Sequence, residues 1–241
     1  MNGIQEYISR DMIKWLRSPV SVVSMLVMPA AWLIFVGLAL PVTFTGNYLD
    51  FIVPGILVMT MLSSSLNGGT LLMFDKILGF LNKFLALPTP RESILFGKIL
   101  FITIRGAVQA TIILVIAVLI GATVLPPAQY GMIYLILLLF GFLMSAFATT
   151  IALYLGDHDS YSAFNTMISM PIFFTSSALM PYDVMPGWLR TIAHVNPLSY
   201  AIDAVRATET GAVPVLQIGI LAVLAGIVIA ICMQMFRRVT I

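Results

Sequence analysis

Long stretches without charged residues constrain this chain more than any other feature. They lie at 20–40, 51–74, 98–123, 130–155, 160–182 and 210–236. The third stretch is the exception, because it begins with Lys98 and contains Arg105. Each is long enough for a helix that crosses a bilayer, which takes about 20 apolar residues. Because lipid offers the backbone no hydrogen-bond partners, a spanning segment must be helical. The sequence therefore predicts an all-α polytopic membrane protein with six transmembrane helices in a single domain, residues 1–241.

The composition excludes several other classes. The chain is 60% apolar and only 9% charged, whereas soluble domains contain about 25% charged residues. Disordered chains are poor in apolar residues. The net charge of +2 is too small for a nucleic-acid-binding protein, so no nucleic acid is expected as a partner. The single cysteine, Cys232, can form neither an internal disulfide nor a thiolate metal site.

Lysine and arginine residues predict the orientation in the membrane. Nine fall in segments of one side, at Arg10, Lys14, Arg17, Lys76, Lys83, Arg91, Lys98, Arg237 and Arg238. Only Arg190 and Arg206 fall in segments of the other side. Because cytoplasmic loops are enriched in basic residues, we expect a cell membrane protein with both termini in the cytoplasm.

Residues 1–17 carry an amphipathic pattern. Ile4, Ile8, Met12 and Trp15 fall on one face of a helix, and charged residues in this segment argue against a signal peptide. We expect a helix that lies in the inner interface with Trp15 as its anchor. The alternative is an extended start of the first span.

Ionisable residues are nearly absent from the spans. Asp50, Asp75, Asp157 and Asp159 lie at span ends, whereas carriers driven by protons or sodium ions usually need a carboxylate at mid-depth. Arg105 is the exception, about 10 Å into the third span at 1.5 Å per residue. It either extends to the inner surface, lines a wet cavity, or pairs with an aspartate or a backbone carbonyl.

Sequence signatures of enzymes are missing, so no catalytic residue is predicted. Gly97-Lys98 resembles the end of a phosphate-binding loop, but Glu92 stands where that loop requires a glycine. Asp157-His158-Asp159 could contact a metal, although such a short polar turn is usually only solvated. No metal site is expected.

The inner segment 75–92 carries a second amphipathic pattern. Its apolar residues have helical spacing, and they are Ile77, Leu78, Leu81, Phe84 and Leu85. Pro88 and Pro90 end the pattern. Such a helix suits docking into a groove of a partner protein; the alternative is a helix that rests on lipid headgroups.

The outer segment 183–207 mixes apolar and polar residues. Asp203, Arg206 and Glu209 recur every three residues and can form ion pairs along one helical face. Trp188 and Tyr200 are residue types that favour a membrane interface. We expect two short helices that enter the outer leaflet; the alternative is a pair of surface helices whose exposed ion pairs contribute little.

Together these motifs resemble a known family. The motifs are Phe74-Asp75-Lys76, Gly79-Phe80-Leu81, Pro88, Arg91 and Gly97-Lys98 in the inner segment, and Trp188-Leu189 and Asn196-Pro197-Leu198-Ser199-Tyr200-Ala201 before the last span. Their order and spacing are similar to the membrane (permease) subunit of type-2 ABC exporters, in the daunorubicin-resistance and nodulation-factor branch. The chain departs from the family at Ser177, where a glycine is common.

The resemblance implies a permease of which two copies, expected to be a homodimer, act with two copies of a separate ABC ATPase subunit. This chain would hold no cofactor, and ATP and Mg²⁺ would bind the ATPase. Segment 75–92 would be the coupling helix, with contacts from Lys76, Gly79, Leu81, Lys83, Phe84, Pro88, Arg91 and Glu92. Re-entrant helices 183–207 would close the outer exit, with a gate formed by Trp188, Asn196, Pro197, Tyr200, Asp203, Arg206 and Glu209.

The translocation path is expected at the seam of the two permeases, along the second and fifth spans. Its candidate residues are Ser63, Asn67, Asn165, Met167, Phe173 and Phe174. The alternative for them is ordinary packing between helices. The implied function is ATP-driven export of an amphipathic, drug-like or lipid-like compound, as in multidrug resistance. An ion-coupled carrier, and an intramembrane enzyme or scaffold, are the competing functions.

Overall fold

The computed structural model describes residues 2–37, 48–79 and 91–238, and every regular element in these ranges is a helix. The elements are α1 (Asn2–Leu16), α2 (Pro19–Ala31), the π-helical η1 (Trp32–Val36), α4 (Tyr48–Ile77), α6 (Arg91–Leu119), α7 (Pro127–Tyr154), α8 (His158–Phe174), the 3-10 helix η2 (Tyr182–Val184), α9 (Gly187–Val195), α10 (Pro197–Glu209) and α11 (Val215–Arg238). For the described residues, the all-α prediction is confirmed.

Five helical segments of these ranges are long and apolar enough to cross a membrane. They are Pro19–Val36, Tyr48–Ile77, Ser93–Leu119, Pro127–Tyr154 and Val215–Arg237. The fifth predicted span, 160–182, corresponds to α8, which has only 17 residues. At 1.5 Å per residue α8 is about 25 Å long, shorter than a hydrocarbon core of about 30 Å. The chain is thus a multi-pass helical protein, and a sixth crossing stays a prediction.

The second span is longer than expected, and this changes the reading of segment 75–92. α4 continues to Ile77, so Asp75–Ile77 extend this span and do not begin a separate coupling helix. The turn after α4 contains Gly79, whose φ of +72° lies in the left-handed region. That conformation is typical of the glycine that follows a helix. Residues 80–90 lie outside the described ranges, so a coupling helix there stays a prediction.

Two other spans differ from the predicted boundaries. α6 begins at Arg91 rather than Lys98, because the charged residues that marked the span edge also form the first turns of the helix. α11 begins at Val215 rather than at residue 210. Gly211 has a φ of +83° and separates α10 from α11, so the uncharged stretch is not one continuous helix.

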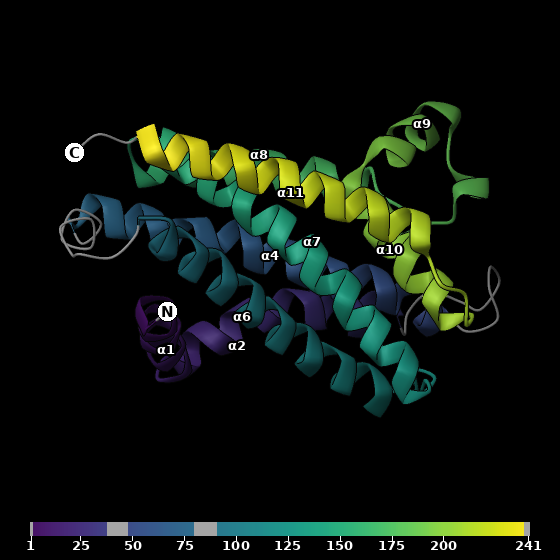
Figure 1. Cartoon of the computed structure of the whole chain (residues 1–241). Helices are drawn as coiled ribbons and strands as arrows, with labels where there is room; N and C mark the ends of the chain where they lie inside the picture. Colours follow the sequence, from purple (N-terminus) through teal and green to yellow (C-terminus); the bar gives the residue numbers. More distant parts are fainter. Residues whose placement is uncertain (1, 38–47, 80–90, 239–241) are drawn as a thin grey trace.

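The helices form an elongated bundle with two different ends (Figure 1). One end, here called the basic end, holds α1, the C-terminal ends of α4, α7 and α11, and the start of α6 and α8. It carries Arg10, Lys14, Lys76, Lys98 and Arg237. α9 and α10 lie at the opposite end (Figure 1). The segments predicted to share one side of the membrane therefore lie at one end of the bundle.

α4 lies at the centre of the bundle and is buried along most of its length. It packs against α6, α7, α8 and α10, and α11 packs on α7. Gly69 allows a close approach to α8 and α7, because a Cβ atom there would overlap the Tyr161 hydroxyl and lie 2.9 Å from the Ala148 carbonyl oxygen. The same hydroxyl donates a 2.6 Å hydrogen bond to the Leu66 carbonyl oxygen. Glycine therefore permits the tightest packing around α4.

α1 is a helix of its own and not the start of the first span. Ser18 breaks the helical path between α1 and α2, with φ −112° and ψ 78°. α1 packs against α6, and Trp15 is only 7% exposed, in a cluster with Phe101 and Ile102. The expectation that Trp15 anchors α1 in the lipid interface is therefore wrong, because its ring packs inside the protein.

We predict that Gly69→Ala lowers the melting temperature of the purified protein in detergent. The added methyl group must displace Tyr161 or the α7 backbone, and such overpacking typically costs about 1–3 kcal/mol. Gly131→Ala in α7 is the matched control, because nothing lies within 4 Å of a Cβ atom there. Equal melting temperatures of the two variants would contradict the packing role of Gly69.

Candidate functional site

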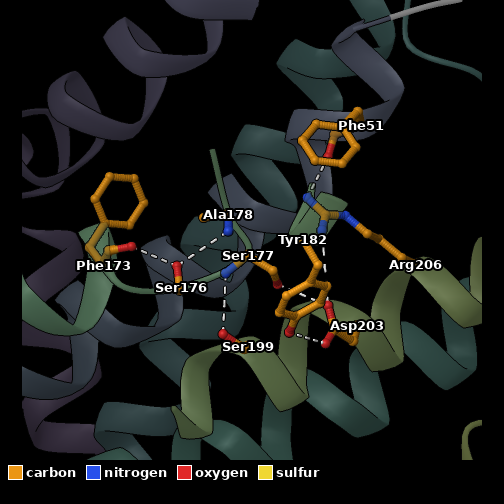
Figure 2. A network of polar contacts seen from close by, with 9 residues as sticks. All are labelled: Phe51, Phe173, Ser176, Ser177, Ala178, Tyr182, Ser199, Asp203 and Arg206. Carbon is orange, nitrogen blue, oxygen red and sulfur yellow. Dashed lines mark hydrogen bonds and ion pairs between the residues drawn. The ribbon is translucent and has the colours of Figure 1, made fainter. Parts of the chain in front are cut away.

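Asp203 is the centre of a polar cluster at the α10 end of the bundle (Figure 2). Its Oδ1 accepts a 2.9 Å hydrogen bond from the Ser177 hydroxyl, and its Oδ2 accepts a 2.6 Å bond from the Tyr182 hydroxyl. Burial, and next the bond to Asp203, raise the pKa of Tyr182 to about 12. Tyr182 therefore stays a neutral donor at physiological pH. The cluster ties the chain after α8 to the middle of α10.

Serine side chains replace helical hydrogen bonds where α8 ends. The Ser176 hydroxyl donates to the Phe173 carbonyl oxygen at 2.6 Å and accepts from the Ala178 backbone N–H at 3.2 Å. The Ser177 backbone N–H donates to the Ser199 hydroxyl at 3.2 Å (Figure 2). Buried backbone groups need such partners, above all at membrane depth. These bonds explain why α8 ends at Phe174 and not at the predicted Tyr182.

Asn196, a predicted gate residue, joins α8 to α10. Its Oδ1 accepts from the Leu198 backbone N–H at 2.9 Å and so caps α10, whose first residue is Pro197. Its Nδ2 donates to the Ile172 carbonyl oxygen at 2.7 Å and to the Thr175 hydroxyl at 3.1 Å. Asparagine is a favoured N-cap, and proline suits the first helical position. One side chain thus fixes the start of α10 against the end of α8.

Arg206 links the cluster to α4. Its guanidinium lies 3.9 Å from the centre of the Phe51 ring, and its Nη2 donates to the Phe51 carbonyl oxygen at 3.2 Å. The ion pair with Asp203 is long, at 3.9 Å. Among the described residues, no ion pair joins Arg206 to Glu209, which ends α10. The predicted ladder therefore forms only in its first step, because Arg206 turns toward Phe51.

α9 and α10 present the other predicted gate residues differently. On α9, Leu189 and Ala193 are buried, whereas Trp188 is 66% exposed. Tyr200 on α10 is half-buried and packs against the core. Trp188 is thus free to contact lipid or another protein, and Tyr200 packs between α10 and the core.

The candidate path residues divide between an exposed face and the core. On the exposed face, the Asn165 amide of α8 donates to the Asn67 amide oxygen of α4 at 3.3 Å. Ser63 lies one turn from Asn67 and is half-buried. Met167 and Phe174 are exposed on α8. We call this surface the α4–α8 face.

Phe173 lies elsewhere, although it is adjacent to Phe174 in sequence. It is 4% exposed, and its ring meets that of Trp32 edge-on, with 5.6 Å between the centroids. It therefore packs inside the chain between η1 and α8.

The structure describes only the two ends of the predicted ATPase contact, residues 75–79 and 91–92. Lys76 donates to the Leu153 and Leu155 carbonyl oxygens at 2.9 and 2.8 Å, and so caps α7. Leu81, Lys83, Phe84 and Pro88 lie outside the described residues, and Arg91 and Glu92 are the first two residues of α6. Beside Gly79, Ile77 is 51% and Leu78 62% exposed. The basic end thus presents apolar side chains next to the turn that follows α4.

Arg105 is held inside the protein and does not extend to the surface. It is 2% exposed, and its Nη2 donates to the Ser64 carbonyl oxygen at 2.7 Å, with a weaker bond from Nε to the Ser64 hydroxyl at 3.3 Å. It also lines a cavity beside α1. Of the three alternatives from the sequence, pairing with a backbone carbonyl and lining a cavity both hold.

Sequence reasoning missed an ion-pair group beside this cavity. Lys98, 3% exposed, pairs with Asp11 at 2.9 Å and with Asp75 at 2.5 Å. Arg10 also pairs with Asp11, at 2.7 Å. The available signal was Asp11 itself, which falls on the apolar face of residues 1–17 with Trp15.

The polar turn before α8 is structural. Asp157 caps α8 by accepting from the Ser160 backbone N–H at 2.8 Å, and this bond lowers the pKa of the carboxyl. His158 stacks on Phe74, with 4.9 Å between the centroids. In residues 2–37, 48–79 and 91–238, no three His, Cys, Asp or Glu side chains gather as a metal site.

Comparison with known proteins supplies the family. Residues 2–210 match the family described as ABC-2 type transporter. The chain belongs to the ABC-2 type transporter family. A protein of Cyanophora paradoxa named as the transport permease ycf38 is 35% identical over 209 residues, which cover 83% of this chain and 71% of that protein. The resemblance noted in the sequence is thereby confirmed.

Two further relatives carry more specific names. The daunorubicin resistance ABC transporter permease protein DrrB1 of Streptomyces coeruleorubidus is 26% identical over 241 residues, 95% of this chain and 84% of that one. Nodulation protein J of Rhizobium meliloti is 22% identical over 127 residues, 53% of this chain and 47% of that one. In this ABC-2 permease the family match extends from α1 through α10, so it includes the Asp203 cluster and the α4–α8 face.

We predict that Asp203→Asn destabilises the permease. Ser177 and Tyr182 donate to different oxygens of Asp203, and in the amide an NH₂ group takes the place of one of them. One hydroxyl therefore loses its acceptor, and a buried donor left unpaired costs on the order of 1–3 kcal/mol. Thermal unfolding in detergent measures the effect. Asp183→Asn is the control, because Asp183 is exposed in η2. Equal melting temperatures of these two variants would show that Asp203 does not hold α10 to the end of α8.

Proposed function

We propose that this chain is the membrane subunit of an ATP-driven exporter. Two copies act with two copies of a separate ABC ATPase subunit, which binds ATP and Mg²⁺. The cargo is an amphipathic, drug-like or lipid-like compound, moved across the cell membrane with both termini in the cytoplasm. The observation that carries the proposal is the family match over residues 2–210, together with relatives named as permeases of ABC transporters.

The sequence motifs and the buried charge of the chain favour a partner protein as the source of energy for transport. The sequence contains no phosphate-binding loop of the G-x-x-x-x-G-K-[ST] type. Arg105, the ion at depth in the third span, is held by Ser64 and not by a carboxylate. A proton- or sodium-coupled carrier would use a titratable pair at this depth. ATP hydrolysis by a partner therefore explains transport better than an ion gradient does.

The basic end supports a cytoplasmic position for the ATPase contact. Basic residues gather at the end where α4 stops and α6 starts, as cytoplasmic segments do. Ile77 and Leu78 are exposed there, and apolar side chains of a short segment can fill a groove of a partner. In this proposal the ATPase docks at residues 77–92, next to these side chains.

We predict that Leu78→Glu weakens capture of the ATPase. The tagged permease is purified from its native membranes in mild detergent, and the eluate is assayed for ATP hydrolysis and for a protein that contains a phosphate-binding loop. A buried carboxylate at an apolar contact is costly, so the ATPase should be lost while the variant still inserts. Val213→Glu, at an exposed position near the α10 end, should retain it. Equal capture by both variants would contradict docking at this end.

The α4–α8 face supports a path between two permeases. Asn67 and Asn165 bond to each other but lie at the surface of the chain, where contact of amides with lipid is unfavourable. Met167 and Phe174 next to them are exposed, and flexible thioether and aromatic side chains can adapt to apolar compounds. A second copy that covers this face would shield the amides and leave a lining of mixed polarity for the cargo.

We predict a disulfide between two copies of Met167→Cys after oxidation in membranes. The background is Cys232→Ala, because Cys232 is the single cysteine and is buried. Val223→Cys, on the exposed side of α11, is the matched control and should stay monomeric on non-reducing gels. Crosslinking of Val223→Cys without crosslinking of Met167→Cys would place the seam at α11 and contradict a path along α8.

A further inference from the structure

A cavity of about 330 Å³ lies where α1, α2, α4 and α6 meet at the basic end. Its polar lining includes Lys14, Trp15, Ser18, Ser21 and Arg105. Phe74 and Leu78, which are exposed, also line it, so the cavity reaches the surface of the bundle.

The ion-pair group beside the cavity is neutral by itself. Asp11 and Asp75 contribute two negative charges, and their partners Arg10 and Lys98 contribute two positive charges. Both carboxylates line the cavity, but each is engaged by a cation. Of the residues that line the cavity, Lys14, Lys98 and Arg105 are positive and Asp11 and Asp75 are negative, which leaves an excess of one positive charge. The cavity therefore has a net attraction for an anion.

Trp15 adds a donor without an acceptor. Its side chain is 93% buried (7% exposed), and its Nε1 finds no hydrogen-bond partner among the described residues. A buried N–H that stays unpaired costs free energy comparable to a lost hydrogen bond. Two hydroxyls of α2, from Ser18 and Ser21, line the same space. The lining thus combines two cations with several neutral donors, which is the chemistry that holds a phosphate group.

We propose that this cavity binds the phosphate group of an anionic phospholipid, with the acyl chains toward the apolar side of the opening. Phe74 and Leu78 at the surface offer the apolar contact that free phosphate would not need. α1 then rests on α6 with a lipid headgroup between its Lys14–Trp15 turn and α2. With the orientation proposed above, the basic end lies at the inner leaflet, which would supply the lipid.

The test measures binding to the delipidated permease in detergent by native mass spectrometry. The probes are palmitoyl-oleoyl phosphatidylglycerol, palmitoyl-oleoyl phosphatidylcholine and inorganic phosphate. Trp15→Phe keeps an aromatic ring, although a smaller one, and removes the indole N–H, and Lys14→Gln removes an exposed charge. Their controls are Trp188→Phe and Arg190→Gln, which make the same changes at the exposed, opposite end. This assay needs neither the ATPase nor transport, so it can fail or succeed independently of the proposed function.

We expect phosphatidylglycerol to bind the wild type in preference to phosphatidylcholine. Trp15→Phe should weaken this binding about tenfold, as for a lost hydrogen bond to a charged group, and Lys14→Gln should weaken it in the same direction. Both control variants should bind as the wild type does. Equal binding of the two lipids, or unchanged binding in Lys14→Gln, would overturn the site. Inorganic phosphate that displaces the lipid at equal concentration would overturn the assignment to a phospholipid.

Discussion

The need to pair every polar group inside a low-dielectric slab governs this fold. Lipid supplies no hydrogen bonds, so the chain must supply them itself. The Arg105 guanidinium donates to Ser64 of α4. The Ser145 hydroxyl of α7 lies within hydrogen-bond distance of the Thr103 hydroxyl of α6 and of the Ser65 hydroxyl of α4. α4 supplies a partner in each of these cases, which explains why the most buried helix also carries many small polar residues.

The same need shapes the two ends of the bundle. At the α10 end, the chain leaves the helical path after Phe174, and serine and asparagine side chains bond the backbone groups that the helix no longer pairs. At the basic end, Lys76 performs a similar role for the last carbonyl groups of α7. A lysine that caps a helix C-terminus also interacts favourably with the helix dipole. Residues that resemble contact or gate residues in the sequence therefore have structural roles within the chain first.

Hydropathy predicted the spans well because the free energy of insertion depends on local composition. Residues 51–74 lie within α4, and α7 contains the predicted span 130–155 up to Tyr154. The end of α8 could not be predicted, because its break depends on Ser177 meeting Ser199 and Asp203, which are more than 20 positions away. The Asp11–Lys98 pair joins residues 87 positions apart. Local sequence patterns do not show which distant residues pair. Asp11 on the apolar face of residues 1–17 did indicate that this carboxylate has a partner inside the protein.

Where the chain leaves polar groups without internal partners, a ligand or a second protein has to complete the structure. Trp15, whose N–H has no partner among the described residues, lines a cavity with excess positive charge, whereas the Asn67–Asn165 pair lies on an outer face. The two places differ in chemistry: the cavity suits an anion with strong acceptors, and the amide pair, which contains both donors and acceptors, suits a neutral polar group or the same face of a second copy. The cavity therefore fits the lipid proposed beside α1, and the amide pair fits the proposed seam between two permeases.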